Sequence, residues 1–141
     1  MEEITIQLEY RKMTLEMVTR EWSFMYDVMK TTLSSLLVTI PIYLSIISFL
    51  LSYIELNRYA SWIIGLCASI LPLILILAYH SYVSFVGERM QLSRDLDINK
   101  FMERANERLY VAKKKLRDSL ILYGIAHAAF IAVIAILNLF I

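Results

Sequence analysis

The chain has 141 residues, of which 59% are hydrophobic and 19% charged, with a formal net charge of +1 and a mean hydropathy of +0.60. The length suits a single domain, and the apolar share exceeds that of an ordinary soluble domain. A near-neutral charge gives no electrostatic reason to expect a nucleic-acid partner. Only three Gly and two Pro are present, too few for the turns of a many-stranded sheet. An all-α integral membrane protein is therefore predicted.

Residues 1–30 carry charges throughout and are predicted to form a cytoplasmic amphipathic helix. One face of this helix is apolar, with residues at alternating spacings of three and four. The face consists of Leu15, Val18, Trp22, Met25 and Met29. It either packs on the rest of the protein or lies along a membrane surface, with Trp22 and Tyr26 among the headgroups. Packing is preferred, because an apolar seam in a later segment also lacks a partner.

Three stretches contain no Asp, Glu, Lys or Arg: residues 31–54, 59–87 and 119–141. A hydrocarbon core about 30 Å thick needs about 20 helical residues at ~1.5 Å each. Three transmembrane helices are therefore predicted. The second stretch is longer than the core requires, so it must tilt or project beyond the lipid.

The positions of Lys and Arg predict the orientation. Four precede the first stretch, one lies between the first and second, and nine lie between residues 89 and 117. Because Lys and Arg gather on the cytoplasmic side of a membrane, the N-terminus is expected inside and the C-terminus outside.

Residues 88–118 are predicted to form a cytoplasmic helical hairpin arm, with a turn near residues 95–98 and Asp97 as the helix N-cap. An apolar seam then leads into the third stretch. Its members are Ile98, Met102, Ala105, Leu109, Ala112 and Leu116. Together with residues 1–30, the arm is expected to continue the membrane helices as one antiparallel bundle. Residues 1–141 therefore form a single membrane domain.

A basic cluster lies just before the third stretch and is the densest run of charge in the chain. It consists of Lys113, Lys114, Lys115 and Arg117. The favoured interpretation is an anchor that fixes the topology, and the alternative is a binding site for anionic lipid headgroups.

No residue pattern predicts catalysis. All thirteen carboxylates lie outside the uncharged stretches, so the intramembrane acid of a proton relay or an aspartyl protease is missing. The glycines are too far apart to cradle a phosphate. The single cysteine, Cys67, offers neither an intrachain disulfide nor a CxxC metal motif. We therefore expect no enzymatic activity, no cofactor and no bound metal.

His80 and His127 are the two histidines within the uncharged stretches. Counted inward from Glu88 and Asp118, they lie eight and nine residues deep, so they are expected at similar depths and able to meet. A histidine pair would be a candidate proton-sensitive gate or part of a metal site, since imidazole titrates near neutrality and ligates transition metals. The favoured alternative places His80 at the headgroup level and has His127 bond to a neighbouring helix.

Ser45, Ser48 and Ser52 form a polar stripe in the first stretch. They either line a narrow aqueous path, or their hydroxyls bond backbone carbonyls near Pro41 or pack against another helix, and the second interpretation is favoured. Three helices cannot enclose a pore, so a channel would require several copies of the chain.

Small residues recur at four-residue intervals in the second and third stretches, a pattern that lets helix backbones approach closely. These faces are Ser61, Gly65 and Ser69 in the second stretch and Gly124, Ala128 and Ala132 in the third. Asn138 is a further polar contact point. The sequence leaves open whether the faces meet within the chain or contact a partner.

The function predicted from these features is non-enzymatic and depends on helix–helix association. The chain would act as an oligomeric scaffold, an envelope component or an accessory subunit of a larger membrane complex. The lipid bilayer, further copies of the chain or other membrane subunits are the expected partners. The alternative is a homo-oligomeric ion channel with the serine stripe and a histidine gate.

Overall fold

The computed structural model describes residues 2–93 and 98–140, without the side chains of residues 2, 3, 7, 10, 11, 88–93, 98–103 and 105. Nearly all of the described chain is helical, in α1 (Glu2–Tyr53), α2 (Arg58–Ser93) and α3 (Ile98–Asn138). The helices contain 52, 36 and 41 residues, which correspond to lengths of about 78, 54 and 62 Å. The all-helical prediction is confirmed. The turn predicted near residues 95–98 and its Asp97 cap lie outside the described residues.

Each long helix continues through the point where its sequence changes from charged to apolar. α1 includes both the charged residues 4–30 and the uncharged stretch that follows, and α3 crosses Asp118 without a break. A helix can do this because its backbone hydrogen bonds are satisfied internally, whether water or lipid surrounds it. The prediction that the apolar helices extend well beyond their uncharged stretches is confirmed.

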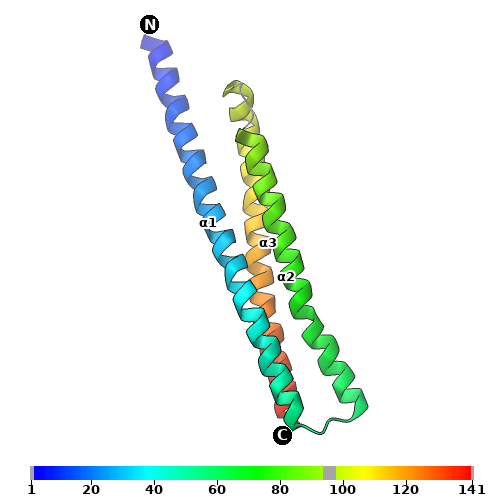
Figure 1. Cartoon of the computed structure of the whole chain (residues 1–141). Helices are drawn as coiled ribbons and strands as arrows, with labels where there is room; N and C mark the ends of the chain where they lie inside the picture. Colours follow the sequence, from blue (N-terminus) through cyan, green and yellow to red (C-terminus); the bar gives the residue numbers. More distant parts are fainter. Residues whose placement is uncertain (1, 94–97, 141) are drawn as a thin grey trace.

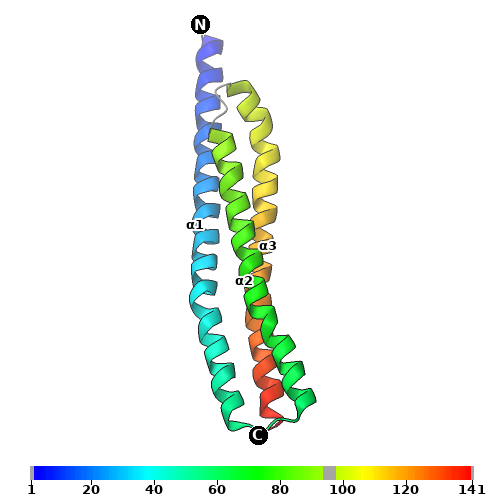
Figure 2. The same cartoon turned by 45° about the vertical axis from the view of Figure 1, so that its right-hand side comes forward.

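The three helices lie side by side, with α1 parallel to α3 and α2 antiparallel to both (Figure 1, Figure 2). Every pair of helices is in contact. Residues 54–57 connect α1 to α2 at the end of the bundle where the C-terminus lies. At the other end, α1 separates from the α2–α3 pair and reaches beyond it (Figure 1).

A large apolar core lies between the uncharged parts of the helices. Its centre is fully buried, for example at Leu36, Leu71 and Val133. The opposite side of each helix is also apolar, with Phe49 60%, Leu66 65% and Ile131 65% exposed. Soluble proteins rarely expose large contiguous apolar surfaces. The described chain thus has three helices that are long and apolar enough to span a membrane, packed against one another.

A smaller apolar cluster lies among the charged segments and involves the seam predicted in residues 1–30. Val18, Trp22, Met25 and Met29 are buried against Phe85 of α2 and Ala112 of α3. The Trp22 and Phe85 rings pack with their centroids 5.1 Å apart. The alternative in which this segment lies along a membrane surface is therefore wrong.

The two predicted seams differ from the structure at their far ends. In α1, Leu15 is 44% exposed and therefore lies outside the buried cluster. In α3, Leu109, Ala112 and Leu116 pack in the smaller cluster as expected. The side chains of Ile98, Met102 and Ala105 lie outside the described residues.

Replacement of Phe85 tests whether the charged half of the bundle is a packed structure. Phe85→Ala removes a fully buried ring and should lower the free energy of unfolding by about 3–5 kcal/mol. Phe24→Ala is the matched control, because Phe24 is 66% exposed, and should change it by less than about 0.5 kcal/mol. Denaturant titration in mild micelles, followed by circular dichroism, measures both. Equal effects of the two variants would contradict the packing described.

Candidate functional site

Polar contacts between α2 and α3 fix the height of each helix relative to the other. The Lys115 ammonium of α3 donates to Ser84 Oγ of α2 at 2.6 Å. The Ser81 hydroxyl donates to the Lys115 carbonyl at a longer 3.5 Å. Residues 81–84 of α2 therefore lie level with Lys115. Sequence reasoning singled out Lys115 only as part of the basic cluster and missed its contacts with Ser81 and Ser84, because only the register of the helices brings these residues together.

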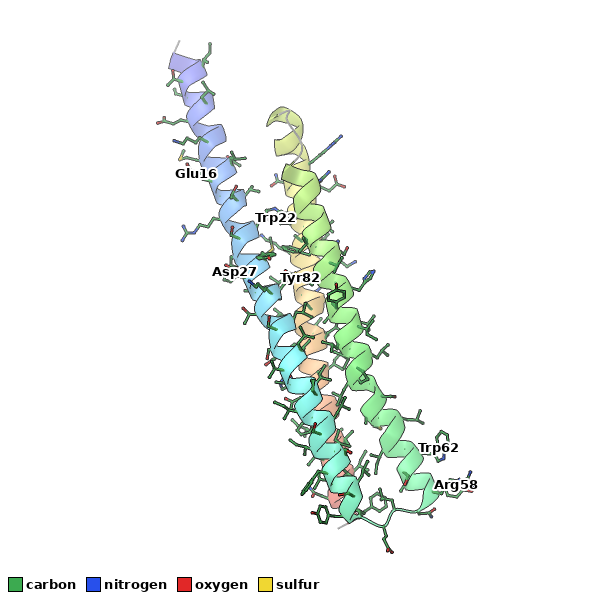
Figure 3. The ribbon with its side chains drawn as sticks, viewed as in Figure 1. Glu16, Trp22, Asp27, Arg58, Trp62 and Tyr82 are labelled. Atoms are coloured by element: carbon green, nitrogen blue, oxygen red, sulfur yellow. The ribbon has the colours of Figure 1, made fainter. Side chains whose placement is uncertain are left out.

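Contacts of α1 extend the same register to the third helix. The Tyr82 hydroxyl donates to that of Tyr26 at 3.1 Å, and Lys113 Nζ pairs with Glu21 Oε2 at 3.1 Å. Trp22 and Tyr82 both lie between α1 and α2 in Figure 3. Further along the bundle, the rings of Tyr43 in α1 and Phe130 in α3 are stacked, with their centroids 3.9 Å apart.

These contacts bring the charged segments of α1 and α3 to an end at one height. Interpolation between the contacts of α1 and α3 places Lys30 within about one helical turn of Asp118. Both lie level with Ala78 of α2. The uncharged residues 79–87 therefore lie beside charged residues of the other helices, and α2 projects by nine residues, or about 13 Å.

The register separates the two histidines. His80 lies level with about residue 116 of α3, eleven residues from His127, a separation of about 16 Å along the bundle. The expectation that the pair meets at one depth is therefore wrong. It assumed that Glu88 and Asp118 lie level, whereas α2 projects beyond that height. His80 is also exposed, on the outside of the bundle.

His127 lies in an aromatic group that joins α3 to α1. The centroid of its ring lies 4.3 Å from that of Tyr123 and 5.6 Å from that of Tyr43, which it meets edge-on. Nδ1 lies 2.8 Å from the Tyr123 carbonyl oxygen. A carbonyl oxygen only accepts, so Nδ1 is the donor in this contact. His127 thus bonds its own helix and contacts α1 through ring packing, not through the interhelical hydrogen bond that we expected.

The serine stripe of α1 faces away from the core. Ser45, Ser48 and Ser52 are all exposed. The Ser45 hydroxyl donates to the Pro41 carbonyl at 2.8 Å, and that of Ser52 donates to the Phe49 carbonyl at 2.6 Å. These bonds agree with the interpretation that the hydroxyls bond their own backbone.

The small-residue faces of α2 and α3 also lie outside the core. The residues that form them are all exposed, namely Ser61, Gly65, Ser69, Gly124, Ala128 and Ala132. No atom of another helix in the described chain lies within 4 Å of the position of a Cβ at Gly65 or Gly124. A shallow hollow of about 380 Å³ lies over Gly65, beside Trp62, Leu66 and the two serines. The described packing of the chain therefore uses neither face. Asn138 is exposed as well.

The basic cluster is partly engaged in contacts within the bundle. Lys113 pairs with Glu21 and Lys115 with Ser84, while Lys114 is exposed. Arg117 lies 3.6 Å from the exposed Asp118. A groove of about 540 Å³ between α1 and α3 runs beside Lys113, with an otherwise largely apolar lining. Two lysines of the cluster thus help to join the helices, a role that the sequence analysis did not assign to them.

Within the described residues, no group of three or more His, Cys, Asp or Glu side chains is arranged to hold a metal ion. Comparison of the chain with protein-family models, curated proteins and solved structures gives no match.

The hydroxyl pair of Tyr26 and Tyr82 provides a test of the register. In a double-mutant cycle of Tyr26→Phe and Tyr82→Phe, the coupling free energy should be about 0.5–1.5 kcal/mol, because each single change leaves one hydroxyl without this partner. The control cycle joins Tyr26→Phe to Tyr110→Phe, since Tyr110 is 73% exposed, and its coupling should be near zero. Chemical denaturation measures both. Equal coupling in the two cycles would contradict the contact.

Proposed function

We propose that the three helices cross a membrane together and that the hydrocarbon core begins at the height of Lys30, Ala78 and Asp118. From this height to Tyr59, α2 has 20 residues without a charge, a span of about 30 Å, which is the thickness of a bilayer core. Tyr59 and Trp62 lie near the other end and are 78% and 65% exposed, as is typical of side chains at a membrane interface. Because the proposed boundary of the lipid core lies at the same height on all three helices, the three can insert as one unit.

Charge asymmetry supports one orientation for this unit. All Lys and Arg residues except Arg58 precede the first apolar span or lie between the second and third. By the positive-inside rule, the N-terminus and the charged half of the bundle face the cytoplasm and the C-terminus faces outward.

The function that the geometry supports best is non-enzymatic assembly in the membrane through helix–helix contacts. The observation that carries it is the exposure of both small-residue faces. Lipid tails solvate a leucine as well as a protein core does, so helices in lipid associate mainly where small residues allow close backbone approach. In this chain those residues lie where no described part of the protomer covers them. An oligomeric scaffold, an envelope component and an accessory subunit all require such a surface.

Bulky substitutions at the glycines separate assembly from folding. A Cβ added at Gly65 or Gly124 would meet nothing within 4 Å in the protomer, and leucine favours a helix over glycine by roughly 0.5–1 kcal/mol. The folded protomer should therefore survive, while the dissociation constant of the assembly should rise at least about tenfold, or ~1.4 kcal/mol. Energy transfer between labelled chains, diluted in vesicles, measures this constant.

Gly87→Leu is the matched control for this experiment. Gly87 is equally open in the protomer but lies on the part of α2 that projects from the proposed lipid core, so its replacement should leave association unchanged. An equal loss in all three variants would contradict the proposal. So would a wild-type chain that remains monomeric at high concentration in lipid and copurifies with no other membrane subunit.

The pore is the alternative function and makes a different prediction. Reconstituted protein would conduct ions, and His127→Ala would alter the response to pH. The exposed serine stripe would then have to face a central axis, although two of its three hydroxyls already donate to carbonyls of their own helix. We favour assembly because the two glycine faces are open and uncharged.

A further inference from the structure

The outer surfaces of α2 and α3 have complementary shapes at matching heights. On α2, exposed residues follow one another at alternating spacings of three and four, and we call them the α2 outer seam: Trp62, Gly65, Ser69, Pro72 and Ile76. The α3 outer seam has the same alternation: Ile121, Gly124, Ala128, Ile131 and Ala135. This spacing is that of a knobs-into-holes helix pair. Each protomer thus offers two such surfaces and fills neither of them.

We propose that the α2 outer seam of one protomer receives the α3 outer seam of a second copy, with Ile131 inserted into the hollow at Gly65. This inference rests on the proposed function, because it specifies the partner and the contact through which the chain assembles. The occupant of the hollow is thus the side chain of another copy of the same protein.

Membrane symmetry determines which residues can meet. Copies related by an axis along the membrane normal keep every residue at the same height, so contacts between copies join residues that are level within one protomer. Ser81 of α2 lies level with Lys115 of α3. Gly65 lies sixteen residues from Ser81, and Ile131 lies sixteen residues from Lys115, in the same direction along the bundle. The hollow and the projecting isoleucine are therefore at the same depth.

At two heights, a large side chain of one seam lies level with a small side chain of the other. Gly65 is open and has the hollow of about 380 Å³ above it, while Ile131 is 65% exposed. Trp62 projects away from the bundle in Figure 3, at a height where the facing seam has only Ala135. Pro72 is level with Gly124, by the same count. Trp62 and Ile131 thus each lie level with a small residue of the other seam, which permits close packing at these two heights.

A twofold contact of α2 with α2 fits less well. It would bring each residue against its own copy, so that Trp62 would meet a second Trp62 and the hollow at Gly65 would face another hollow. The pairing of different seams has a further consequence. A head-to-tail contact leaves one seam of each kind open in a dimer, so assembly continues until a ring closes or a filament forms.

Cysteine cross-linking distinguishes these arrangements in vesicles containing the full chain. All variants carry Cys67→Ser, because Cys67 is the only native cysteine. Under mild oxidation, Gly65→Cys alone and Ile131→Cys alone should remain monomeric on denaturing gels, whereas a co-reconstituted mixture of the two should form covalent dimers. The chain with both substitutions should form a ladder of dimers, trimers and larger species. A disulfide requires Cα atoms within about 7 Å.

A control at another depth tests the register. Gly65→Cys mixed with Ile121→Cys should not cross-link, because Ile121 is exposed like Ile131 but lies ten residues away, or about 15 Å along the helix. Exchanging the large and the small side chain between the two seams gives an independent measurement of the contact. Gly65→Ile should weaken association at least about tenfold, ~1.4 kcal/mol, and Ile131→Ala in the same chain should restore most of the loss.

The outcomes separate this inference from the proposed function. Dimers formed by Gly65→Cys alone would establish the twofold contact and overturn the paired seams, and so would cross-linking in the Ile121 mixture. An oligomer by energy transfer without any cross-link would overturn the inference and leave assembly intact. A monomer in lipid, with neither energy transfer nor cross-link, would overturn both and leave the hollow to lipid chains.

Discussion

The register of α2 against α3 determines the other features of the structure, and a single lysine does most to fix it. Lys115 donates from its ammonium to Ser84 and accepts at its carbonyl from Ser81. A hydrogen bond from a charged group contributes about 1.5–3 kcal/mol, more than one apolar contact that could slide by a turn. Because this contact holds α2 at one height, its uncharged residues 79–87 lie beside the charged part of the bundle, where Phe85 packs against Trp22.

The sequence predicted the helices well, because helix length and apolar content are local properties. The three uncharged stretches lie in three helices, and the residues from Val18 to Met29 with the spacing of a buried face are buried. The relative heights of the helices are not a local property, and the prediction that depended on them was wrong. Equal counts from Glu88 and Asp118 placed His80 beside His127, but the charges of α2 and α3 end at different heights. Only contacts across helices carry that information.

The small-residue faces likewise combine a local feature that the sequence shows with a position in the bundle that it does not show. Their four-residue spacing was visible in the sequence, but the side of the bundle on which they lie depends on which face each helix turns inward. The core took the larger aliphatic faces, with Ile64 and Leu71 on α2 and Val133 on α3, since these bury more area than glycine or serine. The glycines were therefore left outside, where nothing in the described protomer lies within 4 Å of a Cβ placed on them. Size complementarity between the outer seams follows from the same register that separates the histidines.

The depth of labelled residues in the membrane tests the central claim most directly, because the charged segments of α1 and α3 end level with Ala78 of α2, whose own charges begin ten residues further along at Glu88. Fluorophores attached to Thr31→Cys, Tyr79→Cys and Leu120→Cys, each in Cys67→Ser protein, sit at exposed positions next to this height. Depth-dependent quenching by brominated lipids should place the three within about 5 Å of one another, one helical turn. A fluorophore at Gly87→Cys should lie about 12 Å further out, in water. A Gly87 label level with those at Thr31 and Leu120, and a Tyr79 label deep in the lipid, would contradict the register.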